Sequence, residues 1–127
     1  MKKMFFFLLF IMTFQYNVNC QSLNNPLEFQ KNLYDIETIT KDSIIKKSFK
    51  FKNVGKQNVL LTKLDKSCTC SKAYFYKNDT LISPGEEGKI IMEVDTKNKY
   101  GKFMVYVVLI ANTEQKFYKL ILKGNKQ

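Results

Sequence analysis

Hydrophobic and polar residues alternate with a period of two through most of the chain after residue 33. This is the pattern of half-buried β-strands, in which residues two apart point the same way. The clearest case runs from Ile45 to Lys52, where Phe49 and Phe51 share one face and lysines occupy the other. Similar alternation predicts further strands near residues 34–40, 59–64, 74–76, 90–95, 103–111 and 117–123.

Turn-forming residues separate these segments. Asn53-Val54-Gly55-Lys56 ends the strand that carries Phe49, since Asn and Gly tolerate positive φ. Ser83-Pro84-Gly85-Glu86 fits a type II turn, because proline presets φ at the second position and glycine supplies a positive φ at the third. About seven short strands without a helical period predict an all-β fold: an immunoglobulin-like antiparallel β-sandwich over residues 33–124.

The run from Phe103 to Ala111 is apolar on both faces of its predicted strand. One face belongs in the core. We expect the segment before the first strand to cover the other face, because monomers rarely expose large apolar patches. The alternative is that this second face binds a partner; its residues are Met104, Tyr106, Val108 and Ile110.

Residues 1–20 have the pattern of a secretory signal peptide, with two early lysines before an apolar run from Met4 to Phe14. That run is shorter than the about 20 residues of a transmembrane helix, and no later run is long enough either. Cleavage after Cys20 would leave a linker over residues 21–32, whereas lipidation of Cys20 would give a lipid anchor; both alternatives stay open. We expect an exported protein without a transmembrane span, located in the periplasm, at the outer membrane or outside the cell.

Composition and charge narrow the classes of function. The chain has 21 basic and 11 acidic residues, a net charge of +10, and every basic residue is a lysine. Proteins that read nucleic acids depend on arginine forks, so the lysines indicate a solvated surface rather than a nucleic-acid interface. The chain also lacks histidine, the commonest general base and metal ligand. We therefore expect no enzymatic activity and no cofactor.

Cys68 and Cys70 are the candidate chemical site, and three interpretations are open. The pair can be two small thiols packed beside the core. It can be a disulfide, although extended backbone would place the two Cα atoms about 6.5–7 Å apart, at the limit for a bridge without a local bend. It can also bind a soft metal; Cu(I) suits two thiolates better than zinc, which takes four ligands, and Met92 or Met104 could add a thioether.

Two triplets of an acidic, a hydroxyl and an apolar residue resemble the O-glycosylation signal of Bacteroidetes secreted proteins. They are Asp42-Ser43-Ile44 and Asp79-Thr80-Leu81, and Asn78-Asp79-Thr80 is also an N-glycosylation sequon. Both triplets lie at predicted turns, so Ser43 and Thr80 are candidate glycosylation sites. The alternative is that these residues only form the turns.

Short motifs follow one another in a fixed order: Phe49-x-Phe51-x-Asn53-x-Gly55, Cys68-x-Cys70, Pro84-Gly85-Glu86-x-Gly88, Gly101-x-Phe103 and Asn112. This set resembles Domain of Unknown Function 1573, a family found mostly in secreted proteins of Bacteroidetes-type bacteria. The resemblance implies an immunoglobulin-like sandwich related to the major-sperm-protein and cilia-associated modules, and no assigned activity. The family usually has Cys-Gly-Cys-Thr where this chain has Cys68-Thr69-Cys70-Ser71. Because threonine resists a positive φ, we expect a tight turn to be less favourable here.

Together these observations predict an exported, noncatalytic binding or structural module of the bacterial cell envelope. Its partner would be a protein or another envelope component, bound at a sheet edge or an apolar face. The alternative is a thiol redox protein or a Cu(I)-binding protein that uses Cys68 and Cys70.

Overall fold

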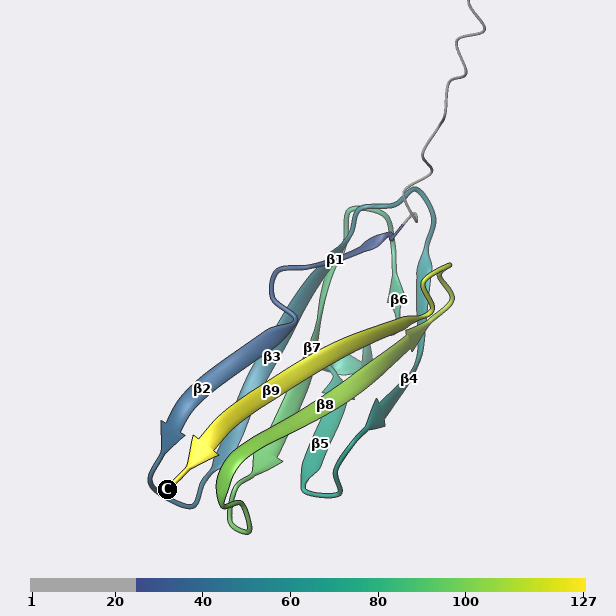
Figure 1. The fold of residues 1–127 in the computed structure, drawn as a ribbon. Helices are drawn as coiled ribbons and strands as arrows, with labels where there is room; N and C mark the ends of the chain where they lie inside the picture. The colour runs from purple at the N-terminus through teal and green to yellow at the C-terminus, as the bar shows by residue number, and fades with distance from the viewer. Residues whose placement is uncertain (1–24) are drawn as a thin grey trace, which may run out of the picture.

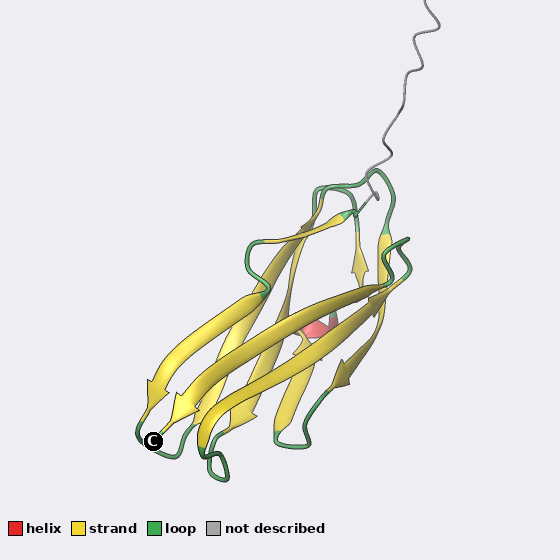
Figure 2. Cartoon of the chain, in the orientation of Figure 1, coloured by secondary structure: helices red, strands yellow, loops and turns green. Residues whose placement is uncertain are grey.

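The computed structural model describes residues 25–127, which form two β-sheets packed face to face (Figure 1). One sheet has the strand order β1-β3-β7-β5 and the other the order β2-β9-β8-β4-β6. The strands are β1 (Leu27–Phe29), β2 (Leu33–Ile39), β3 (Ile44–Asn53), β4 (Val59–Lys66), β5 (Ser71–Phe75), β6 (Leu81–Ile82), β7 (Glu87–Asp95), β8 (Gly101–Ala111) and β9 (Phe117–Lys126). Within residues 25–127 the only helical element is the short 3-10 turn η1 (Tyr76–Asn78) (Figure 2). No helix there has the length and apolarity needed to cross a membrane.

The hydrophobic core lies between the two sheets and confirms the predicted all-β, immunoglobulin-like sandwich. Phe49 is fully buried at its centre, and its ring packs edge-on against the Tyr34 ring, with the two ring centroids 5.1 Å apart. The other buried members come from both sheets: Leu27, Phe51, Val59, Leu61, Ile82, Ile90, Met92, Val94, Val105, Val107, Leu109, Ala111, Tyr118, Leu120 and Leu122.

Strand β4 shows how a local irregularity changes the alternation. Leu61 pairs with Ala111, and the next paired residue, Lys63, lies opposite Ile110, so Thr62 is the extra residue of a β-bulge. The bulge shifts the period by one position. Leu64 therefore packs against the core although it is three residues from Leu61.

The strand pairing differs from a purely antiparallel sandwich of seven strands. Leu27–Phe29 falls within the segment predicted to be a linker, yet it pairs with β3 and buries Leu27. The two-residue strand β6 also raises the number of strands to nine. Finally, β2 runs parallel to β9, although their sequence positions lie at opposite ends of the domain. These pairings are long-range, and alternation within one segment carries no information about them.

Residues 25–32, the described part of the lead-in segment, do not cover the outer face of β8, so that prediction is wrong. β1 lies in the opposite sheet, where Leu27 fills the end of the core with only 2% of its surface exposed. Burial there removes the apolar side chain of Leu27 from water. Met104 consequently remains 57% exposed.

The family-like motifs build turns and close contacts. The Glu86 amide donates to the Ser83 carbonyl at 2.9 Å and Gly85 has φ of 81°, so the predicted type II turn is confirmed. Gly88 lies opposite Phe51 across the β3–β7 pair. A Cβ atom at Gly88 would lie 2.6 Å from the Cζ atom of Phe51, so only glycine leaves room for this ring.

One lysine departs from the predicted solvated surface. Lys126, at the end of β9, is only 7% exposed. Its ammonium group pairs with Asp42, between β2 and β3, and donates to the Thr96 carbonyl at 2.6 Å, just after β7. A buried charge requires such partners, and this one ties the last strand to two loops.

Ionisation of the Tyr118 phenol lowers the free energy of unfolding of the domain at alkaline pH. Burial raises the pKa of its phenol above the ordinary 10.0, and the hydrogen bond with Thr113 lowers the pKa in part. The folded state therefore keeps this proton to a higher pH than the unfolded chain does. Its contribution to stability is complete below about pH 10 and is lost as the pH rises from there through the raised folded-state pKa.

We expect Tyr118→Phe to remove this part of the pH dependence. Urea unfolding of both proteins between pH 8 and 11 would measure it, because the difference between them cancels the titration of the lysines. The advantage of the wild type over the variant should be constant below about pH 9 and fall above about pH 10. An advantage that stayed constant up to pH 11 would contradict the assignment.

Candidate functional site

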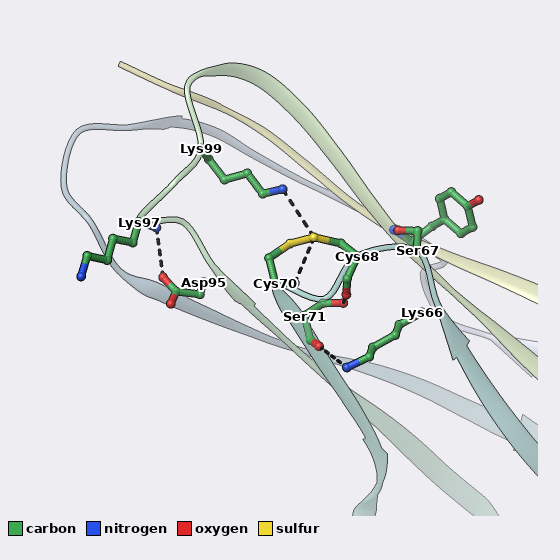
Figure 3. The surroundings of a disulfide bond; sticks show 9 residues. Lys66, Ser67, Cys68, Cys70, Ser71, Asp95, Lys97 and Lys99 are labelled. Carbon is green, nitrogen blue, oxygen red and sulfur yellow. Dashed lines mark hydrogen bonds between the residues drawn. A yellow bond between two sulfur atoms is a disulfide. The ribbon is translucent and has the colours of Figure 1, made fainter.

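The Cys68-Thr69-Cys70 segment lies in the connection between β4 and β5, where the chain crosses from one sheet to the other (Figure 3). In the structure the Sγ atoms of Cys68 and Cys70 are bonded as a disulfide, and their Cα atoms are 5.1 Å apart. This separation is shorter than in extended backbone because the chain turns here. The Ser71 amide donates to the Cys68 carbonyl at 3.2 Å, which closes the turn.

The expectation that threonine disfavours a tight turn at this position is wrong. The turn forms, and neither Thr69 nor Cys70 has a positive φ. This is the backbone of a type I turn, which accepts most residues at its central positions. Glycine is therefore not required between the two cysteines.

Ser71 anchors the disulfide loop to the sandwich. It is fully buried, and its hydroxyl donates to the Cys68 carbonyl at 2.8 Å. The Lys66 ammonium donates to the Ser71 carbonyl at 3.1 Å, and the Asp95 amide to the Cys70 carbonyl at 3.0 Å. Both sides of the loop are thus held by hydrogen bonds that do not involve sulfur.

The two sulfur atoms have different surroundings. The Cys70 amide donates to the Cys68 sulfur at 3.1 Å, and the Lys99 ammonium lies 3.7 Å from that same sulfur (Figure 3). In the described part of the chain, no donor is hydrogen-bonded to the Cys70 sulfur. A positive charge and an amide dipole beside Cys68 favour a negative charge on that sulfur.

The disulfide adds little to the stability of the fold. Closing a loop of three residues is worth about 1.6 kcal/mol in the chain-entropy description. A single buried aromatic side chain contributes about twice as much. Stability alone therefore does not account for a cysteine pair at this position.

The metal interpretation applies to the reduced thiols and stays a prediction. Between residues 25 and 127 no group of three or more His, Cys, Asp or Glu side chains is placed to hold a metal ion. Of the two candidate thioethers, Met92 is fully buried in the core, whereas Met104 lies on the outer face of β8. Neither is a hydrogen-bond partner of the cysteines.

The candidate modification sites lie in other connections than the one that carries the disulfide. Ser43 is exposed between β2 and β3, and its hydroxyl donates weakly to the Lys41 carbonyl at 3.4 Å. Thr80 is half-buried between η1 and β6, and its carbonyl accepts from the Leu61 amide at 2.7 Å. Glycosylation at both positions stays a prediction. The signal peptide, its cleavage site and Cys20 lie outside the described residues.

The outer face of β8 and β9 forms a second candidate site, which faces the viewer in Figure 1. Cross-strand pairs place Tyr106 beside Ile121 and Ile110 beside Phe117. Leu33 of β2 extends the row on the far side of Ile121. We call this surface the apolar stripe; it consists of Leu33, Met104, Tyr106, Val108, Ile110, Phe117 and Ile121.

Charged side chains lie among and beside the residues of the apolar stripe. The Lys119 ammonium lies 4.3 Å from the centroid of the Tyr106 ring. Two other lysines pair with acids: Lys63 with Asp65 at 3.0 Å and Lys123 with Asp35 at 3.8 Å. The face thus mixes apolar and charged side chains, because Lys119 lies directly opposite Val108 and Lys123 opposite Met104. Sequence reasoning identified only its β8 part, because the pairing with β9 and β2 is long-range.

Comparison with known proteins agrees with this description of the fold. The model of the family described as Protein of unknown function (DUF1573) matches residues 27–126. No curated protein matches the sequence. A protein of unknown function from Porphyromonas gingivalis W83 is similar in structure, with a TM-score of 0.68, 17% identity and 86% of this chain covered; the chain spans 51% of that protein.

Two further solved structures show how widely this fold is used. The Vibrio cholerae VesB protease matches with a TM-score of 0.64 and 14% identity, over 81% of this chain and 32% of that one. The ASH / PapD-like domain of human CEP192 matches with a TM-score of 0.61 and 10% identity, over 91% of this chain and 96% of that one. At such identities the likeness concerns the fold alone.

Proposed function

Because the chain belongs to the DUF1573 family, which is described as having no known function, we propose a role for it from its own surface. It is a noncatalytic binding module of an exported protein of the cell envelope. Its binding surface is the apolar stripe on the outer face of the β2-β9-β8-β4-β6 sheet. The observation that carries this proposal is the exposure of large apolar side chains toward the two ends of that face, with Met104 57% and Phe117 53% exposed.

The sheet edges are less suited to binding than this face. β1 and β6 are edge strands of three and two residues. β5 has five residues, and β2 is interrupted by a register shift near Glu37, which has φ of 56°. Short or irregular edges are how sheet proteins prevent strand addition. Large exposed apolar surface, in contrast, marks interaction sites.

The chemistry of the face specifies the kind of partner. Tyr106, Val108 and Ile110 would pack against an apolar surface of another protein. Lys119 has its ammonium over an aromatic ring instead of an acid, so it would favour an acidic residue of the partner opposite Val108. We therefore propose a protein partner that presents apolar side chains flanked by carboxylates.

Export is supported by two features of the chain. Residues 1–20 have the composition of a signal peptide, and a disulfide such as Cys68–Cys70 persists in oxidising compartments. The location would be the periplasm, the outer membrane or the exterior. Mass spectrometry of the mature protein would distinguish cleavage after Cys20 from its lipidation, and would detect glycans on Ser43 or Thr80.

Photo-crosslinking in cells followed by binding with purified proteins would test the surface. A photoreactive amino acid at Tyr106 should cross-link one partner protein, and the same group at Tyr74, on the outer face of the other sheet, should not. With the partner purified, we expect Tyr106→Ala to weaken binding about 30-fold, as for a central aromatic contact worth about 2 kcal/mol.

Tyr74→Ala is the matched control, because Tyr74 is also a partly exposed tyrosine on a sheet face. It should change the affinity less than twofold, and circular dichroism would show that both variants fold. Equal cross-linking from both positions, or unchanged affinity in Tyr106→Ala, would refute the proposed surface. Cross-linking only to a second copy of this chain would refute the proposed heterologous partner.

A further inference from the structure

We propose that the Cys68–Cys70 disulfide exchanges electrons with the thiols of a partner protein, with Cys70 as the sulfur that is attacked and Cys68 as the sulfur that leaves as a thiolate. This activity is separate from binding at the apolar stripe. It concerns the connection that follows β4, and it gives each of the two cysteines its own role.

The donors around Cys68 provide the chemical basis for this asymmetry. When a disulfide is attacked, the departing sulfur takes a negative charge, and the departure is faster when that charge is stabilised. The Lys99 ammonium, 3.7 Å from the Cys68 sulfur, and the Cys70 amide, 3.1 Å from it, both favour that charge. Attack on Cys70 therefore places the charge where the structure already has its donors.

The position of Lys99 depends on a connection remote in sequence. Lys99 lies between β7 and β8, the other crossing between the two sheets near the disulfide (Figure 3). The Lys99 amide donates to the Thr96 carbonyl at 3.0 Å, and Thr96 is itself buried. The backbone that carries Lys99 is thus fixed by a structured turn, from which the side chain reaches Cys68.

The loop can lose the disulfide and keep its shape. The Ser71 hydroxyl and amide bind the Cys68 carbonyl, and the Asp95 amide binds the Cys70 carbonyl. These contacts would keep the two thiols adjacent after reduction, so reoxidation needs no search through the unfolded chain. Both cysteines are half-buried, and Thr69 between them is exposed, which leaves the loop open to a partner.

A partner dithiol reduces the Cys68–Cys70 disulfide in two steps. A thiolate of a partner dithiol attacks the Cys70 sulfur; a sulfur–sulfur bond to the partner forms, and the Cys68–Cys70 bond breaks. The second partner thiol, after losing its proton, attacks its own sulfur in the mixed disulfide and releases Cys70. The partner is oxidised to a disulfide by two electrons, and Cys68 and Cys70 are reduced and take up the two protons. In the reverse direction, the Cys68 thiolate is the nucleophile.

Reduction kinetics of the purified protein would test the role of Lys99. Dithiothreitol serves as the dithiol at pH 7, and free thiols are trapped with iodoacetamide and counted by mass spectrometry. We expect the wild type to be reduced while folded, and Lys99→Met to slow reduction roughly three- to tenfold. Lys97→Met is the matched control, since Figure 3 shows the Lys97 side chain directed away from the sulfurs; its rate should match the wild type.

Single-cysteine variants would test which sulfur carries the charge. With Cys70→Ser, the remaining Cys68 should react with iodoacetamide at pH 7 roughly three- to tenfold faster than Cys70 does in Cys68→Ser. Adding Lys99→Met should abolish this difference. The proposal is overturned if the disulfide resists dithiothreitol until the protein unfolds, if Lys99→Met and Lys97→Met behave alike, or if the two cysteines react equally. Should a single-cysteine variant fail to fold by circular dichroism, the lysine comparison still decides.

Discussion

Phe49→Ala is expected to lower the free energy of unfolding by about 3–5 kcal/mol, the usual cost of removing a buried aromatic side chain. Phe49 has no exposed surface and packs against the Tyr34 ring at the centre of the core. Since domains of this size are stable by about 5–15 kcal/mol, the variant would keep only a fraction of its stability. Urea unfolding would measure the loss, and the melting temperature should fall by roughly 12 °C or more.

Phe117→Ala is the control for Phe49→Ala, because it removes the same atoms from a side chain that is 53% exposed. Its cost should stay below about 1 kcal/mol, since little apolar surface returns to water. Equal losses from the two variants would mean that the core is not organised around Phe49.

Asn53→Ala should cost about 3 kcal/mol, because one fully buried side chain completes three hydrogen bonds. Its amide group donates to the carbonyls of Gln57 at 2.8 Å and Ile82 at 2.9 Å, and its side-chain oxygen accepts from the Gly55 amide at 3.0 Å. Truncation leaves these backbone groups without their partner. The same urea titration measures the effect.

Asn58→Ala is the matched control for Asn53→Ala, since Asn58 lies in the same connection but is exposed. It should change stability by less than about 0.5 kcal/mol. A loss of that small size in Asn53→Ala would show that the loop between β3 and β4 does not depend on this side chain.

Asn53 also explains part of the ordered set of motifs that resembles the family. Asn53 links the turn after β3 to β6, and Gly55 allows the chain to approach Pro26, where a Cβ atom would lie only 2.7 Å from the proline Cβ. Gly88 makes room for Phe51 in the same end of the sandwich. These motif residues are needed for the architecture, and the motif therefore does not identify a catalytic site.

The candidate sites were accessible to sequence analysis to different degrees. Cys68 and Cys70 were recognisable because their residue type and spacing are local properties. Lys99, which distinguishes one sulfur from the other, is 31 residues from Cys68 and has no signal of its own among the many lysines. Likewise, half of the apolar stripe was visible along β8, whereas Ile121, Phe117 and Leu33 join it only through strand pairing.

The sequence by itself determined which segments are strands, except for the two shortest, β1 and β6, which of their faces is apolar, and where the Ser83–Glu86 turn forms. These properties depend on neighbours within a few residues: side chains two apart share a face, and proline and glycine restrict or extend local φ. The tertiary structure alone decided that Leu27–Phe29 joins β3, that β2 runs parallel to β9, that the outer face of β8 stays uncovered, and that a lysine reaches Cys68. Each of these depends on contacts between residues far apart in the chain, whose free energy reflects the packing of the whole sandwich rather than any local pattern.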